Sequence, residues 1–179
     1  MIQTERLVLR SWQDDDVDAF LAVNSDPDVM ATLGPVMNRD EVAALIARMQ
    51  GIEAEHGHCF WAMVRRGDGL LIGWCGAIRG TAGPVADKLE IGWRMRRDCW
   101  GKGYVNEAAC ATLDWLFANR PDDAAWAITN VDNHRSRAVM ERLGMTYQPG
   151  LDFDHPRIAA DDPLLRHVTY RIGRDEWGP

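Results

Sequence analysis

The sequence predicts an α/β fold in which a mixed, twisted sheet of about six or seven strands is flanked by about four helices. Three consecutive strand-like runs in the middle of the chain imply antiparallel pairing, because short turns can join such strands. After them the pattern alternates strand, helix, strand and helix, which implies a parallel pair with a crossover. A chain with both patterns is expected to form one mixed sheet.

The first part of the chain is expected to hold one short strand and two helices. Residues 7–9 form a short apolar strand, and the apolar face of residues 17–21 predicts the first helix. Asn38 followed by Glu41 is typical of a capping box, and apolar residues recur at helical spacing over 42–49. The sequence shows only an irregular link between these two helices.

From residue 58 the apolar pattern changes to that of strands. Residues 59–64 and 70–78 are strand-like, and the segment Arg66-Gly67-Asp68-Gly69 between them has the composition of a hairpin turn. A loop rich in glycine and proline over 80–86 then leads to a third strand over 89–95.

The centre of the chain is a strand that passes through a Gly-Lys-Gly turn, residues 101–103, into a helix. Apolar side chains form one stripe of helical period over residues 105–117. Glycines let the main chain approach an anion closely, and the first helical turn offers free N–H groups and a positive dipole end. The arrangement is suited to holding phosphate; a tight turn with a solvated lysine is the structural alternative.

The last part of the chain alternates strand and helix. Gly144 follows the final apolar residue of the second helix of this part, the usual place for a glycine at a helix C-terminus. The expected elements are a strand, a helix, a strand, a loop rich in Asp and Pro and a last strand, at residues 125–129, 134–143, 145–148, 149–164 and 167–172.

Composition limits the class of protein. A chain of 179 residues with 46% hydrophobic and 26% charged residues suits one globular domain, here residues 1–179. The net charge of −7 argues against nucleic-acid binding and is compatible with a cationic substrate. The four cysteines lie singly and no zinc spacing occurs, so we expect reduced thiols and no metal. Without a signal-like or bilayer-spanning run, a cytoplasmic location and no membrane partner are expected.

Three segments resemble one family. Residues 100–108 read Trp-Gly-Lys-Gly-Tyr-x-x-Glu-Ala, residues 133–145 read Asn-x-x-Ser-x-x-Val-x-Glu-x-Leu-Gly-Met, and residues 4–10 read Thr-Glu-Arg-Leu-x-Leu-Arg. In this order they resemble the acetyl-CoA-dependent GNAT N-acetyltransferases, within the branch that includes the ribosomal-protein N-terminal acetyltransferases. The resemblance covers residues 4–177 and implies the GNAT fold.

The resemblance implies direct transfer of an acetyl group from acetyl-CoA to a primary amine, on a protein N-terminus or a small molecule. No metal is implied, and no acyl-enzyme is required because no cysteine has a nucleophile's setting. The acidic composition slightly favours cationic acceptors, and a homodimer accords with family habit. In the family the first two helices form one wall of the acceptor cleft, so residues 30–37 between them would touch the substrate.

The family pattern also implies where the cofactor binds. Strand amides would hold pantetheine, the glycine turn would hold the pyrophosphate, and the start of the next helix would contact the pantetheine arm. The positions implied are Trp93, Arg94, Met95, Trp100, Gly101, Lys102, Gly103, Tyr104, Val105, Asn106, Asn133 and Ser136.

Two residues are candidates for the chemistry. Glu90 lies in a strand of apolar neighbours, where burial would raise its pKa into the range of a general base; a carboxylate in a salt bridge is the alternative. Asn133 is expected to cap a helix, and Ser136 lies one turn later on the same side. The resemblance places Ser136 near the thioester sulfur, and a solvated hydroxyl is its structural alternative.

Three positions depart from the family pattern. Met140 stands where many members carry a tyrosine acid, and a thioether cannot donate a proton. Trp100 replaces a Gln or Arg, although Trp is usual in this branch. Val105 replaces a Gly or Ala, and we expect its branched side chain to leave the backbone and the cofactor affinity little changed.

The acceptor end is the least defined. His155, Arg157, Asp161 and Asp162 lie in the late loop, and His167 begins the last strand. A histidine near the cleft could relay protons, but a single histidine is more often structural. Two other functions remain open from sequence alone. One is a non-catalytic acyl-CoA-binding regulator on the same scaffold, and the other is an unrelated nucleotide-binding domain, although the chain lacks Gly-x-x-x-x-Gly-Lys-Ser/Thr.

Overall fold

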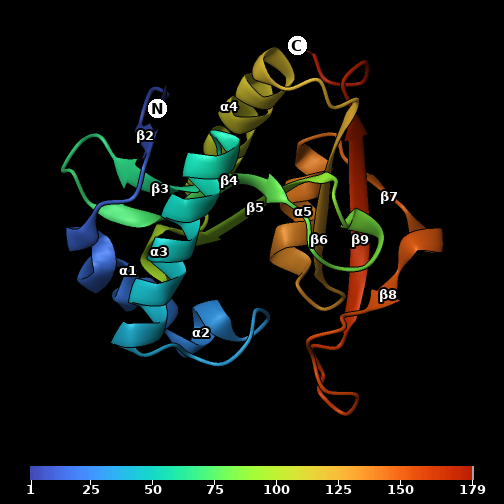
Figure 1. Cartoon of the computed structure of the whole chain (residues 1–179), viewed down its shortest axis with the longest axis horizontal. Helices are drawn as coiled ribbons and strands as arrows, with labels where there is room; N and C mark the ends of the chain where they lie inside the picture. Colours follow the sequence, from blue (N-terminus) through green and yellow to red (C-terminus); the bar gives the residue numbers. More distant parts are fainter. Residues whose placement is uncertain (179) are drawn as a thin grey trace.

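The protein is described by a computed structural model that covers residues 1–178, and Pro179 lies outside the described residues. Within them a nine-stranded mixed sheet is flanked by helices, in the order β1-β2-β3-β4-β5-β6-β9-β7 with β8 paired to β9 (Figure 1). The strands are β1 (Ile2–Gln3), β2 (Leu7–Arg10), β3 (Phe60–Arg65), β4 (Leu71–Arg79), β5 (Leu89–Met95), β6 (Ala124–Asn130), β7 (Thr146–Tyr147), β8 (Phe153–Asp154) and β9 (Arg166–Gly173).

The predicted fold class is confirmed, and the differences are short elements. The α-helices are α1 (Val17–Asn24), α2 (Pro27–Met30), α3 (Arg39–His56), α4 (Tyr104–Asn119) and α5 (His134–Arg142). The single-turn helix α2 lies where the sequence showed only an irregular link, because Asp26 caps it and Pro27 occupies its first turn. Strand β8 lies inside the predicted loop 149–164, where it pairs with β9.

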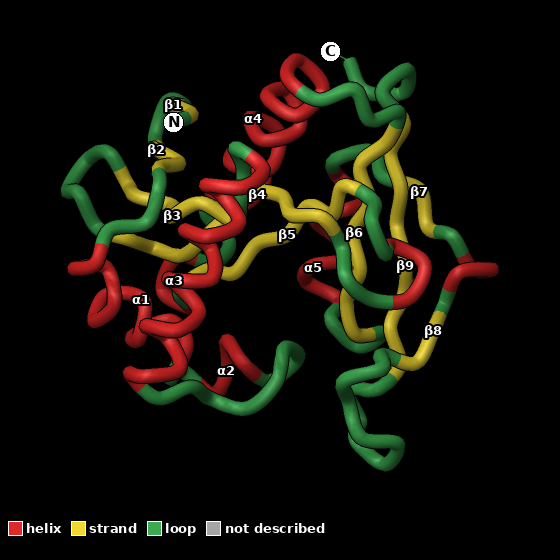
Figure 2. The backbone as a smooth tube through the Cα atoms, viewed as in Figure 1, coloured by secondary structure: helices red, strands yellow, loops and turns green. Residues whose placement is uncertain are grey.

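The sheet is built from two groups of strands that meet at a single register pair. Strands β1 to β5 pair antiparallel in sequence order, and β6 pairs antiparallel with β9 along its whole length. Between the groups, β5 and β6 are parallel and share only the pair Glu90–Trp126. Figures 1 and 2 show β4 and β5 running across the view while β6 and β9 run up it. The strands therefore separate beyond Glu90.

The two faces of the first strand group carry different helices. Adjacent residues of β4 point to opposite faces: the Trp74 ring lies 5.4 Å from the ring of Phe20 in α1, whereas Cys75 Sγ lies 3.7 Å from the hydroxyl of Thr112 in α4. Helix α3 packs against α1 on the first of these faces. The capping box of Asn38 and Glu41 at the start of α3 is confirmed.

Helix α4 follows its predicted pattern closely. Its buried residues are those of the predicted stripe up to Leu116, and Phe117 is partly buried against the same core. Among residues 1–178, no helix has both the length and the apolar character that a membrane crossing requires.

Candidate active site

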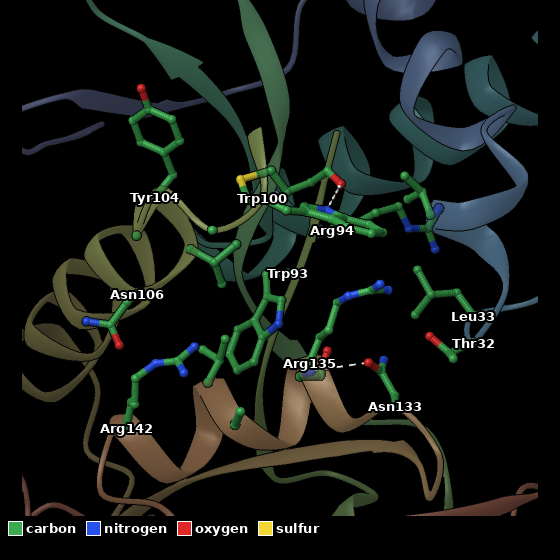
Figure 3. A pocket seen from close by; sticks show the side chains of 18 of the residues that line it. Thr32, Leu33, Trp93, Arg94, Trp100, Tyr104, Asn106, Asn133, Arg135 and Arg142 are labelled. Carbon is green, nitrogen blue, oxygen red and sulfur yellow. Dashed lines mark hydrogen bonds between the residues drawn. The ribbon is translucent and has the colours of Figure 1, made fainter. Parts of the chain in front are cut away.

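The larger of two cavities in the site, about 520 Å³ in volume, lies between the C-terminal half of β5, the start of α4 and helix α5 (Figure 3). It opens where β5 leaves β6. Every residue predicted to bind the cofactor lines it except Lys102, whose ammonium group donates to the carbonyl oxygen of Asp98 at 2.8 Å, within its own turn. Residues that lie far apart in the sequence therefore line one cavity.

The turn before α4 has the backbone of an anion site. Gly101 and Gly103 have φ of +72° and +78°, in the left-handed region that favours glycine. A Cβ on Gly101 would meet nothing within 4 Å, so the main chain is open on that side. Gly103 caps α4 without a side-chain hydrogen bond. The first amides of α4 are thus left for a ligand, at the positive end of the helix dipole.

Two arginines of α5 add positive charge to the same cavity. Arg135 and Arg142 come from α5 and face β5 and the start of α4 (Figure 3), and the Arg135 guanidinium lies 4.1 Å from the centre of the Trp100 ring. Neither residue was predicted from the sequence to line the site. Their position on one face of the helix was predictable from the sequence, because residues seven positions apart fall on the same face.

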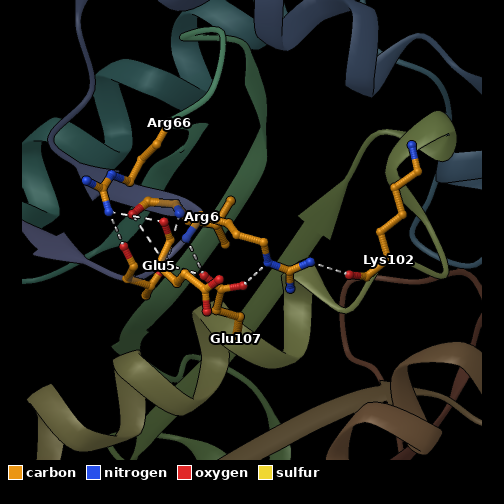
Figure 4. Close-up of polar contacts among 7 residues, drawn as sticks. Glu5, Arg6, Arg66, Lys102 and Glu107 are labelled. Atoms are coloured by element: carbon orange, nitrogen blue, oxygen red, sulfur yellow. Dashed lines mark hydrogen bonds and ion pairs between the residues drawn. The ribbon is translucent and has the colours of Figure 1, made fainter.

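The N-terminal segment ties the turn to α4 (Figure 4). The guanidinium of Arg6 pairs with Glu107 at 2.6 Å, donates to the carbonyl oxygen of Lys102 at 2.9 Å and lies 4.6 Å from the centre of the Tyr104 ring. Burial alone would raise the pKa of Glu107, but hydrogen bonds from Thr4 and Arg6 outweigh it and lower that pKa. Arg6 therefore joins the N-terminal segment to both the turn and α4.

Asn133 and Ser136 line the cavity from the start of α5. Asn133 Oδ1 accepts a hydrogen bond from the Ser136 amide at 3.2 Å, so the predicted cap is confirmed. Its Nδ2 donates to the Thr129 hydroxyl at 2.9 Å, which fixes the side chain against β6. Met140 is buried in the core, and Val105, also buried, lines the cavity from the first turn of α4.

Glu90 does not line this cavity. It lies in a second one of about 170 Å³, whose walls come from α3, β3, β4, β6 and the loops after β4 and β8. The half-buried carboxyl group has the environment predicted from its apolar neighbours: burial raises the pKa of Glu90 to about 7, and the charges of Arg157 and Arg48 partly oppose this shift. The two catalytic candidates, Glu90 and Ser136, therefore line different cavities along β5, because Glu90 lies at the pair with β6 and Ser136 faces the part of β5 beyond it.

Some of the candidate residues of the late loop line the second cavity and others lie outside it. His155 and Arg157 line the second cavity, whereas His167 lies behind His155 with ring centres 4.9 Å apart. Burial lowers the pKa of both histidines, so both are neutral near pH 7. Asp161 and Asp162 line neither cavity. Of the segment 30–37 that the family pattern assigned to the substrate, Thr32 and Leu33 line the larger cavity.

Arg94 contributes its side chain as well as its strand position. Its guanidinium donates to Asn24 in α1 and lies 5.0 Å from the centre of the Trp74 ring, while its Nε is buried without a hydrogen-bond partner within residues 1–178. Burial lowers the pKa of Arg94 to about 10, so the group stays charged at neutral pH. From the sequence, only the main-chain amide of Arg94 was predicted to contribute to the site.

Comparison with known proteins gives one consistent result. The family model described as an acetyltransferase (GNAT) domain matches residues 6–146. The N-acetyltransferase YnaD of Bacillus subtilis, itself uncharacterized, is 28% identical over 177 residues, which is 98% of each chain. Among solved structures, a GNAT-family acetyltransferase from Bacillus anthracis superimposes with a TM-score of 0.80 at 24% identity, covering 98% of this chain and 99% of that one.

A further structural neighbour was solved with its cofactor product. RimL, the ribosomal L7/L12 alpha-N-protein acetyltransferase in complex with coenzyme A, has a TM-score of 0.76 at 14% identity and covers 95% of each chain. This similarity concerns the fold. It shows that this fold recurs in a protein that was solved in complex with coenzyme A.

Proposed function

The chain belongs to the GNAT family of acetyl-CoA-dependent acetyltransferases, and from this premise we propose that it acetylates a primary amine with Glu90 as the general base. The observation that carries the proposal is the position of Glu90. A carboxyl group with a pKa of about 7 lies on β5 at the last residue paired with β6, and the glycine turn lies at the other end of the same strand.

The large cavity fits coenzyme A in the chemistry of its walls. Open glycine backbone, the N-terminus of α4 and the guanidinium groups of Arg135 and Arg142 suit a diphosphate. The amides of residues 93–95, at the edge that β5 exposes after leaving β6, suit the amide groups of the pantetheine arm. A thioester held there would approach Glu90 along the strand.

The proposed step needs one proton acceptor. Glu90 takes a proton from the acceptor's ammonium group, which frees the nitrogen lone pair to attack the thioester carbonyl carbon. The C–N bond forms, the C–S bond breaks, and coenzyme A leaves as a thiolate. The remaining excess proton on nitrogen passes to the thiolate or to solvent. Ser136 is proposed near the sulfur, but a thiolate is a good leaving group and the step does not depend on an acid.

Replacing Glu90 by Gln tests this role. We expect kcat to fall about 10²- to 10⁴-fold while the dissociation constant for coenzyme A changes little, because the base acts on the acceptor and not on cofactor binding. Release of free thiol with a panel of primary amines measures turnover, and calorimetry measures binding. Glu55→Gln, an exposed change on α3, is the matched control. A Glu90→Gln protein with undiminished turnover would remove Glu90 from the mechanism.

A further inference from the structure

The second cavity carries two arginine side chains that form no ion pair among the described residues. Arg48 reaches it from α3 and Arg157 from the loop between β8 and β9. Neither guanidinium forms an ion pair with a carboxylate of residues 1–178. Glu90 is the single acidic residue among the described residues that line the cavity. The wall is therefore cationic around one carboxyl group whose pKa lies near neutrality.

The loop that carries Arg157 holds it in place over the cavity. The guanidinium of Arg157 donates to the hydroxyl of Thr81, in the loop after β4, and the Arg157 amide donates to His155 Nδ1 at 3.3 Å. Asp154, three residues before Arg157, pairs instead with Arg166 at 3.2 Å. Within residues 1–178 the remaining side-chain N–H donors of Arg157, and all those of Arg48, have no hydrogen-bond partner and are available to a ligand.

This local charge is opposite to what the composition suggested. The net charge of −7 favoured a cationic acceptor, but a ligand in a small cavity responds to the groups that line it. Guanidinium groups match carboxylate and phosphate oxygens in geometry and charge. A cationic acceptor such as a polyamine would meet two arginines beside a single carboxyl group.

We propose that the acceptor is a small amine that also carries a carboxylate or phosphate group, with Arg48 and Arg157 binding the anionic group and the amine directed at Glu90. This inference rests on the acetyl transfer proposed above. A cavity of about 170 Å³ suits a free amino acid or an amino phosphate. The N-terminus of a protein has no anionic group next to its amine, unless a side chain supplies one.

Matched pairs of acceptors test the anionic group. Each L-amino acid of a panel is compared with its carboxamide, and ethanolamine phosphate with ethanolamine, by thiol release. We expect kcat/KM to be about tenfold to a hundredfold higher for the anionic member, the range typical of a hydrogen-bonded charge. The amino acids and the amino phosphate distinguish the two sources of anion. Equal rates for the paired acceptors, or faster reaction of the neutral members, would overturn the proposal.

Arginine variants separate this proposal from the one before it. Arg157→Gln and Arg48→Gln should each raise KM for the anionic acceptor about tenfold relative to its neutral partner, and leave the coenzyme A dissociation constant unchanged. Arg39→Gln, on the exposed part of α3 and paired with Asp18, is the control. If both variants keep the preference for the anionic member, the arginines do not bind it. In that case acetyl transfer that still requires Glu90 leaves the proposed function standing.

Discussion

Protonation of Glu90 links the chemistry of the site to the stability of the fold. The folded-state pKa of about 7 lies above the ordinary value of 4.5. Between these values the folded protein binds a proton that the unfolded chain has released, so the free energy of unfolding falls as pH rises through this window. Below pH 4.5 both states are protonated, and above pH 7 the loss is complete. A base useful near neutrality is thus kept at the expense of stability.

Glu90→Gln should consequently remove a pH dependence as well as an activity. The difference in free energy of unfolding between the variant and the unchanged protein should shift by about 1 to 2 kcal/mol in favour of the variant from pH 5 to pH 8. This range is reduced to allow for the partial exposure of the side chain. Urea unfolding at both pH values measures it, with Glu55→Gln as the control. The same stability difference at both pH values would mean that the Glu90 pKa is close to ordinary.

At the scale of single residues, the environment of a side chain could be predicted where its neighbours in the chain determine it. The apolar residues around Glu90 predicted its burial, and Asn133 was predicted as a cap from its place before a helix. Arg48 was not identified, because it lines the second cavity together with residues of β5 and of the late loop that are distant from it in the sequence. No periodicity marks such a residue.

At the scale of elements, the turn before α4 depends on a segment from the opposite end of the sequence. The glycine conformations were predictable from the motif, since a positive φ is natural for glycine alone. The contacts of Arg6 with the turn and with α4 were not predictable, although residues 4–10 match the family pattern. Its contacts to Glu107 and to the Lys102 carbonyl join parts of the chain that no local rule relates.

Removing the contacts of Arg6 should weaken cofactor binding without unfolding the protein. Arg6→Ala loses the ion pair with Glu107 and the bond to the Lys102 carbonyl, so the turn is no longer held in one orientation (Figure 4). We expect the coenzyme A dissociation constant to rise about tenfold, since hydrogen bonds to charged groups are the stronger ones. Calorimetry measures the change.

Arg66→Ala provides the matched comparison. Arg66 bonds to the carbonyl oxygens of Thr4 and Glu5 in the same segment and does not contact the turn. If both alanine variants weaken binding equally, Arg6 acts only by supporting the N-terminal segment. If only Arg6→Ala weakens binding, the contact between Arg6 and the turn is what supports cofactor binding.

Over the whole molecule, two groups of strands are joined by one register pair, and the large cavity lies beside the part of β5 that follows this pair. The predicted mixed sheet and the order of its elements were correct, because hairpin signals and strand–helix alternation are local. The division of the predicted site between two cavities could not be read from the sequence, because it follows from where β5 leaves β6. The match to the GNAT family over residues 6–146 also makes the unrelated nucleotide-binding alternative wrong.

A ligand that fills the large cavity should therefore bind the exposed part of β5 and not the turn alone. Coenzyme A at a hundred times its dissociation constant should stabilise the protein by about 2.7 kcal/mol through mass action. Hydrogen exchange should slow at the first amides of α4 and at residues 93–95 together, since both line the large cavity. ATP, which offers phosphates without a pantetheine arm, should protect the turn at most. Protection by coenzyme A that stops at the turn would show that the exposed edge of β5 does not hold the pantetheine arm, and the proposed approach of the thioester to Glu90 would fail with it.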